Sequence, residues 1–306
     1  MNRIVPDISD YWISLRDSTG RGPTETMTRG RRLSLSFYRQ ATNWLLPTGV
    51  QDLLLRSGKR IIGTRFVFLA CFPKSGSTLL SESLSGLPGW TQSSSIPSDW
   101  TREQEPIHEY IARDWIAVGR NIVFKNHVSH SEYLSSLFER YNMHCVFLVR
   151  NLPDVCCSLS DHFDQESVTL PFVALNNSQL DRIDDSNDRA RFIIDLAIPW
   201  YINCYVSWMR YISDGGRCQI VRYEDLAGDT ISTIGQIITA VDIEHSADEI
   251  QTAVRRAGSL PNKSRFNVGT VGRGRDYLNK HPHTEETLRR YISYYPDIDF
   301  SPVFDD

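Results

Sequence analysis

Four short apolar runs predict the strands of one buried sheet. They are largely continuous and rich in residues with high β propensity. Runs of this kind are typical of strands covered on both faces, as in a parallel sheet. The four runs span 65–72, 121–125, 145–149 and 219–223.

Helical patterns lie between these runs. This alternation predicts an α/β fold, a parallel sheet flanked by helices on both faces. The stretch 88–106, rich in Ser, Pro, Gly and Trp, is predicted to be a surface loop. Apolar residues recur at helical spacing in 79–87, 107–118, 131–141, 153–159, 192–211, 229–241 and 285–295.

The chain is predicted to consist of an appendage and one large domain. Residues 1–64 are locally basic and carry an apolar helical pattern broken at Pro47. We predict an N-terminal helical appendage packed on the core, rather than a helix that docks on a membrane surface. Residues 65–306 form the predicted α/β domain, and its uneven, acidic segment at about 161–190 is predicted to be a lid-like insertion.

Composition narrows the function classes. The 306 residues are 41% hydrophobic with a net charge of -4, which suits a globular α/β domain and gives no basic signature for nucleic acid. No run predicts a membrane span, and the N-terminus has no signal-peptide pattern. The six cysteines form no C-x-x-C pair and are predicted to be reduced thiols of a cytoplasmic protein.

Ionisable side chains follow each predicted strand. The carboxyl ends of parallel strands meet at one edge of a sheet, which is where ligands of such sheets bind. The sequence therefore predicts a binding site at this edge. The groups that follow the four strands are Lys74, then Lys125 and His127, then Arg150, then Tyr223 and Glu224.

The loop at 73–78 has the features of an anion site. It joins a buried strand to a helix N-terminus, whose backbone N–H groups and dipole attract negative charge. Lys74 adds a positive charge, and Ser75, Ser77 and Thr78 add hydroxyl groups. A Walker A loop would place its lysine after the second glycine, whereas here the lysine precedes the only glycine, Gly76.

Four stretches resemble the sulfotransferase family, in order. The loop is similar to the family's Pro-Lys-Ser-Gly-Thr-Thr phosphosulfate loop. Segment 122–127 resembles its Ile-Lys-Thr-His segment, and 148–158 its Arg-Asn-Pro-x-Asp-Val-x-x-Ser run. Segment 221–226 is close to its Tyr-Glu-Asp-Leu. The resemblance covers residues 66–226 and implies the P-loop-NTPase-like sulfotransferase fold.

The resemblance implies a PAPS-dependent enzyme. PAPS (3′-phosphoadenosine 5′-phosphosulfate) would give its sulfuryl group to a hydroxyl or amine of a small-molecule acceptor and leave PAP, with no metal. His127 is the candidate general base, Lys74 neutralises the leaving group, and Lys125 stabilises the sulfuryl oxygens. His127 and His130 form a His-x-x-His pair that could hint at a metal site, but no further residue lies at the spacing expected of a metal ligand.

The same resemblance assigns the nucleotide contacts. The 5′-phosphate goes to Lys74, Ser75, Gly76, Ser77 and Thr78, the 3′-phosphate to Arg150 and Ser158, and the adenine lies near Tyr223. The C-terminal match is weaker: 266–272 keeps both glycines of the family's Arg-Lys-Gly-x-x-Gly motif but has Asn267 and Val268 in place of the basic pair. Arg265, Arg273 or Arg275 could supply the lost charge to the 3′-phosphate, and Arg273 is taken as the predicted contact. Leu79 stands where the family has a Trp that stacks on adenine.

Two other functions stay open at this stage. A P-loop kinase or nucleotide phosphotransferase would need a magnesium-binding carboxylate, which Glu224 or Asp225 could supply, and a Walker lysine, which is absent. A non-catalytic nucleotide-binding protein would keep the loop without turnover. A homodimer is also left open.

Overall fold

The core of the protein is a five-stranded parallel sheet. The computed structural model describes residues 64–93, 104, 106–116, 120–168, 173–259 and 271–304. The strand order is β2-β3-β1-β4-β5, and every pair is parallel. The strands are β1 Phe66–Cys71, β2 Trp90–Ser93, β3 Asn121–Asn126, β4 His144–Val149 and β5 Cys218–Arg222.

The four predicted strands are confirmed as β1, β3, β4 and β5, but the prediction of a loop throughout 88–106 is wrong at its start. Residues 90–93 form β2, which pairs with β3 at the edge of the sheet. This strand is only four residues long, and only its outer residues, Trp90 and Ser93, are buried. Such a segment lacks the apolar run that marks a central strand, so pairing with β3 decides its structure.

Side chains of the central strand β1 enter two separate cores. Successive strand residues point to opposite faces. Phe66 and Phe68 belong to one hydrophobic cluster, and Val67 and Leu69 to the other. All four are fully buried. Because both faces of β1 are covered, its sequence is continuously apolar, as the parallel-sheet prediction required.

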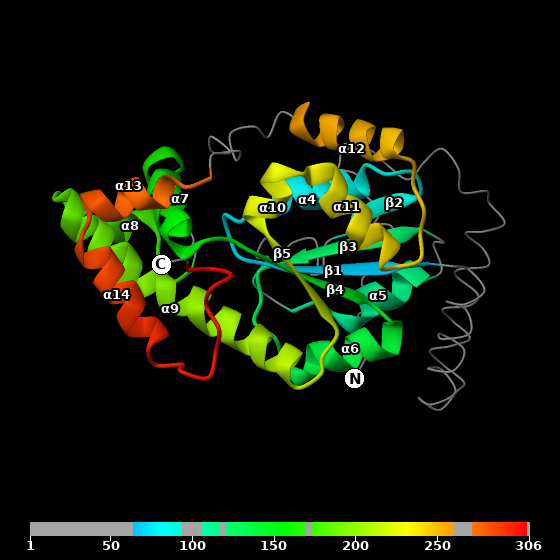
Figure 1. Cartoon of the computed structure of the whole chain (residues 1–306), viewed down its shortest axis with the longest axis horizontal. Helices are drawn as coiled ribbons and strands as arrows, with labels where there is room; N and C mark the ends of the chain where they lie inside the picture. The colour runs from blue at the N-terminus through cyan, green and yellow to red at the C-terminus, as the bar shows by residue number, and fades with distance from the viewer. Residues whose placement is uncertain are drawn as a thin grey trace, which may run out of the picture.

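Helices cover both faces of the sheet, as predicted (Figure 1). On one face lie α4 Ser77–Ser85, α10 Tyr223–Gly228, α11 Thr230–Thr239 and α12 Ala247–Ser259. The other face carries α5 Glu109–Ile116, α6 Glu132–Tyr141 and part of α9 Ser186–Ser213. At the left of the view gather α7 Leu152–Gln165, α8 Asn177–Leu180, α13 Arg273–Lys280 and α14 His283–Ile292.

The long helix α9 ties distant segments together through aromatic side chains. The Tyr201 hydroxyl donates to the carbonyl of Pro73 at 3.3 Å, and the Tyr205 hydroxyl donates to the carbonyl of Asp299 at 2.9 Å. Trp208 Nε1 donates to the carbonyl of Val128 at 2.9 Å. All three side chains are buried. Helix α9 therefore supports the segments that follow β1 and β3.

Two predicted parts of the chain are only partly covered by the described residues. The appendage at 1–64 lies outside them except for Thr64, and its role stays a prediction. Helix α7 continues to Gln165, so the first residues of the predicted insertion at 161–190 belong to that helix. The stretch also contains α8 and the start of α9. Its function as a lid stays a prediction.

Candidate active site

The ionisable groups predicted at one sheet edge do lie there. Lys74 follows β1, Lys125 is the second-last residue of β3, and His127 follows β3 directly. Arg150 follows β4, and Tyr223 follows β5. Since β3, β1, β4 and β5 are consecutive parallel neighbours, their carboxyl ends form one continuous rim. Arg150 contacts the Lys74 carbonyl and the Tyr223 ring, and His127 contacts the Cys71 carbonyl at the end of β1.

The loop at 73–78 has the backbone of an anion cradle. Lys74 and Gly76 both adopt positive φ, 65° and 79°, and Ser75 lies between them. Loops of this kind turn successive N–H groups toward one point. Helix α4 begins at Ser77 without a side-chain cap, so its first-turn N–H groups also point out of the helix at the loop. A non-glycine residue at positive φ is strained, and such strain concentrates at functional sites.

Ser75 has a hydrogen-bond partner just before the loop, and its predicted phosphate contact stays a prediction. Its hydroxyl donates to the carbonyl of Phe72 at 2.6 Å, its N–H donates to the same oxygen at 3.3 Å, and the side chain is fully buried. Ser75 therefore holds the turn closed in this structure. Ser77 is buried and Thr78 is half-buried, and both start helix α4.

Tyr223 packs directly on the loop. A Cβ added to Gly76 would lie 2.7 Å from Cδ2 and Cε2 of the Tyr223 ring. Real Cβ atoms do not approach that closely, so this position requires glycine both for its φ and for the ring that covers it. The ring, which is 5% exposed, forms a wall beside the cradle.

The contacts of His127 determine which ring nitrogen carries the proton. Nδ1 lies 2.9 Å from the carbonyl oxygen of Cys71, at the end of β1. A carbonyl only accepts hydrogen bonds, so this contact places the proton on Nδ1 and leaves Nε2 as the basic nitrogen of the neutral ring. The Cys71 thiol donates to the carbonyl of Asn126 at 3.4 Å and touches Nδ1 at 3.3 Å. The ring is thus fixed between β1 and β3.

Arg150 joins three segments of the rim. Its Nη1 donates to the carbonyl of Lys74 at 2.9 Å, and its Cζ lies 4.3 Å from the centroid of the Tyr223 ring. Its Nη2 lies 3.6 Å from Oδ2 of Asp154. The residue is buried, with 7% exposure. One planar guanidinium therefore connects the loop after β1, the segment after β5 and helix α7.

Ser158 and Arg273 lie on the helices beside this rim. Ser158 is buried on α7, four residues after Asp154. Arg273 opens α13 and forms an ion pair with Asp161 of α7, Nη1 to Oδ2 at 2.7 Å. The structure therefore shows an α7 partner for the Arg273 side chain, and its predicted phosphate contact stays a prediction. Sequence reasoning did not predict that Asp154, Asp161 and Cys71 hold parts of the site in place. Their partners on α13 and at His127 are distant in sequence.

A family model matches most of the chain. The model, described as a sulfotransferase domain, covers residues 65–270. The chain belongs to the sulfotransferase family. The match confirms the fold class and the sulfuryl-transfer function that the four motifs predicted.

Several solved structures are similar to this sulfotransferase at low sequence identity, and a mouse sulfotransferase among them shares its fold. Mouse sulfotransferase SULT7A1 complexed with PAP matches with a TM-score of 0.58 and 17% identity, over 78% of this chain and 86% of that chain. Sulfotransferase STF9 from Mycobacterium avium matches with a TM-score of 0.47 and 14% identity, over 97% of both chains. Retinol dehydratase in a complex with retinol and PAP matches with a TM-score of 0.48 and 14% identity, over 76% of this chain and 82% of that chain. No curated protein matches.

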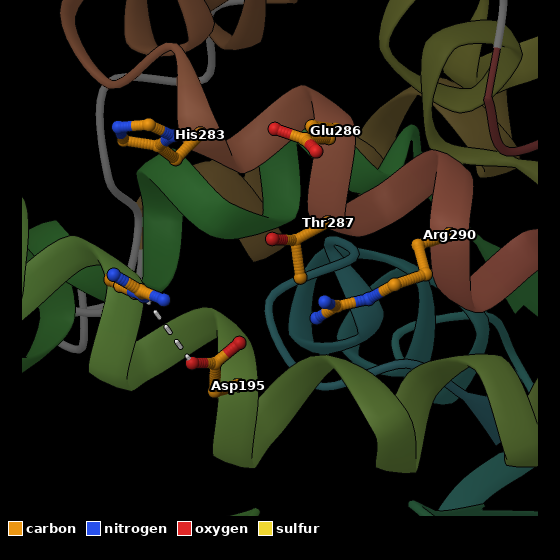
Figure 2. A pocket seen from close by; sticks show the side chains of 6 residues that line it. Asp195, His283, Glu286, Thr287 and Arg290 are labelled. Carbon is orange, nitrogen blue, oxygen red and sulfur yellow. Dashed lines mark ion pairs between the residues drawn. The ribbon is translucent and has the colours of Figure 1, made fainter.

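Other surface features of the described residues lie apart from the rim. A polar hollow of about 120 Å³ lies between α9 and α14, and contains the ion pair of Arg191 with Asp195 at 3.9 Å (Figure 2). None of the predicted site residues lines it.

Within the described part of the chain, no helix is long and apolar enough to cross a membrane. The same residues contain no group of three or more potential metal ligands.

Proposed function

We propose that this sulfotransferase takes a sulfuryl group from PAPS and transfers it to a hydroxyl or amine of a small-molecule acceptor. The donor choice is supported by the cradle at 73–78 and by the fold it shares with a structure solved with PAP. Sulfuryl transfer resembles phosphoryl transfer, since charge grows on a phosphate leaving oxygen during in-line displacement. The site must therefore supply fixed positive charge at that oxygen and a base opposite it.

The nucleotide is assigned along the rim. The N–H groups at the start of α4 hold the 5′-phosphate, with Lys74 placed to neutralise the leaving oxygen. Arg150 offers its guanidinium to the 3′-phosphate, and Ser158 on α7 is assigned to the same phosphate. The Tyr223 ring, already packed on Gly76, covers the adenosine side of the cradle.

His127 is assigned as the general base through Nε2. The Cys71 carbonyl fixes the proton on Nδ1, and this is the observation that carries the assignment. As the acceptor oxygen or nitrogen attacks sulfur, its proton passes to Nε2, and the resulting imidazolium keeps its hydrogen bond to Cys71. Lys125, two residues earlier on β3, stabilises the charge on the transferring group.

The experiment is a transfer assay with two histidine variants. The protein is incubated with PAPS and a panel of hydroxyl and amine compounds, and mass spectrometry detects acceptors that gain one sulfuryl group, together with PAP. His127→Asn keeps a side-chain N–H near the position of Nδ1 but removes Nε2. We expect it to lower turnover about 100-fold or more while PAP binding is unchanged.

Controls separate the base from the donor. His144→Gln changes a histidine at the start of β4 whose side chain contacts Gln219 on β5. It should leave turnover unchanged. Undiminished turnover by His127→Asn would remove the base assignment. If PAPS yields neither PAP nor a sulfated product, and ATP with magnesium yields a phosphorylated one, the protein is a kinase instead.

A further inference from the structure

A buried carboxylate joins the start of two helices at the rim. Asp154 lies in the first turn of α7 and is 1% exposed. Its Oδ2 accepts from the N–H of Gly272 at 2.9 Å, and its Oδ1 accepts from the N–H of Gly274 at 2.5 Å. Both partners belong to the start of α13, more than a hundred residues later. One side chain therefore caps a helix that lies far away in sequence.

The start of helix α13 consists of residues that allow this carboxylate to approach its N–H groups. Its N-cap residue, Gly272, has a φ of 86° and provides no side-chain cap of its own. A Cβ on Gly274 would lie 2.5 Å from backbone and side-chain atoms of Pro153 and from the backbone nitrogen of Asp154. The two helix starts are therefore in direct backbone contact. A buried carboxylate with two N–H donors is well satisfied, and its charge is favourable at a helix N-terminus.

The same carboxylate faces Arg150. Its Oδ2 lies 3.6 Å from Nη2 of that guanidinium, which also contacts the Lys74 carbonyl and the Tyr223 ring. Asp154 therefore contacts a side chain that touches the cradle, the Tyr223 ring and α7.

We propose that Asp154 is a positioning residue for recognition of the nucleotide's 3′-phosphate: it fixes the Arg150 guanidinium against the first turn of α13. This inference rests on the proposed assignment of the 3′-phosphate to Arg150. Asp154 does not touch the phosphate, since a carboxylate would repel it. Its effect comes from holding a guanidinium and a helix N-terminus, two anion-binding groups, in one arrangement.

Charge and geometry predict opposite effects, which makes the inference testable. Removing the negative charge alone should strengthen phosphate binding, because Arg150 would be less neutralised. Removing the geometry should weaken it. Asp154→Asn removes the charge and replaces one acceptor with an N–H₂ group that faces another N–H. Asp154→Glu keeps the charge but moves the carboxylate by one methylene.

The experiment compares two nucleotides by calorimetry. Adenosine 3′,5′-bisphosphate and adenosine 5′-phosphate differ only in the 3′-phosphate. The dissociation constant of the monophosphate divided by that of the bisphosphate therefore measures recognition of the 3′-phosphate. We expect Asp154→Asn and Asp154→Glu each to lower this ratio about tenfold, while binding of the 5′-phosphate alone is unchanged. Asp229→Asn, which changes the carboxylate that caps helix α11 through the N–H of Ser232, is the matched control and should keep the ratio.

Hydrogen exchange of the nucleotide-free protein supplies a second readout. Both Asp154 variants should speed exchange of the N–H groups at 272–276 and leave β1 and β4 protected. Tighter bisphosphate binding by Asp154→Asn, with no change in Asp154→Glu, would show a charge effect and overturn the proposal, as would unchanged exchange at α13. A wild-type protein that does not prefer the bisphosphate, but whose variants loosen α13, would overturn the Arg150 phosphate assignment and leave the positioning of α13 standing.

Discussion

The guanidinium of Arg150 stacks on the ring of Tyr223, with Cζ 4.3 Å from the ring centroid. The two residues follow neighbouring strands, β4 and β5, and both are buried. The contact sets the plane of the guanidinium while Nη1 is held by the Lys74 carbonyl. A planar, stacked cation with fixed donors is suited to bind a phosphate, whereas a lysine at the same place would be a mobile point charge.

Arg150→Lys should therefore weaken PAP binding although the charge is kept. Loss of the stacking and of the fork geometry predicts a dissociation constant raised about tenfold or more, measured by calorimetry. Arg210→Lys is the control, because Arg210 is an exposed arginine of α9 whose side chain pairs with Asp297. Equal affinities for the wild type and Arg150→Lys would contradict the assigned role.

Gly76→Ala should disrupt the cradle. The substitution places a Cβ against the Tyr223 ring at a position with a φ of 79°, so we expect a loss of about 1–3 kcal/mol in the free energy of unfolding together with weaker PAP binding. The matched control is Gly235→Ala in helix α11, where no atom lies within 4 Å of the added Cβ. That change should be neutral or stabilise by up to about 1 kcal/mol. Urea denaturation measures both, and a Gly76→Ala protein as stable as Gly235→Ala would refute the close approach.

A pair of tyrosines on α9 tests whether that helix supports the loop. Tyr201→Phe removes the hydrogen bond to the Pro73 carbonyl, and Tyr205→Phe removes the one to the Asp299 carbonyl. Tyr201→Phe should cost about 1 kcal/mol of unfolding free energy, because it leaves a buried acceptor with one partner fewer. Tyr205→Phe should cost no more than that, because Asp299 is exposed and water can replace the lost donor. Only Tyr201→Phe should also weaken PAP binding, since Pro73 begins the cradle. If both variants bind PAP equally, α9 does not position the loop.

Stability should fall in alkaline solution. Burial raises the pKa of the Cys145 thiol well above 9.0, and it also raises the pKa of the Cys204 thiol and the Tyr201 hydroxyl. Above their ordinary pKa values the unfolded chain loses these protons while the folded protein keeps them, so unfolding becomes easier as pH rises. This stabilisation is complete at neutral pH and is lost through the alkaline range.

The urea midpoint measures this pH dependence. It should be constant near neutrality and decrease from about pH 8 upward, with a slope set by the number of protons retained on folding. Cys204→Ala removes one of these thiols, so its curve should be flatter than that of the wild type even if its stability at neutral pH is lower. A midpoint that stays constant to high pH would show that these groups ionise in the folded protein.

Local patterns in the sequence are enough to predict the central strands and the anion loop. Both faces of β1 are buried, so every residue from Phe66 to Cys71 is apolar and the strand can be recognised from its sequence. The loop at 73–78 is local as well, because a glycine turn before a helix N-terminus needs only neighbouring residues. His127 and Arg150 could be placed at the same edge because each directly follows a strand of a parallel sheet.

The contacts that hold these groups depend on how the elements pack. The strand β2 is too short and polar to be marked by its own pattern, and it exists by pairing with β3. The proton position on His127 depends on the Cys71 carbonyl, and the cap of α13 depends on Asp154, in each case a partner brought near by packing. Local patterns encode which residues are buried, whereas the pairing of polar groups across elements depends on how those elements pack, which one sequence does not state.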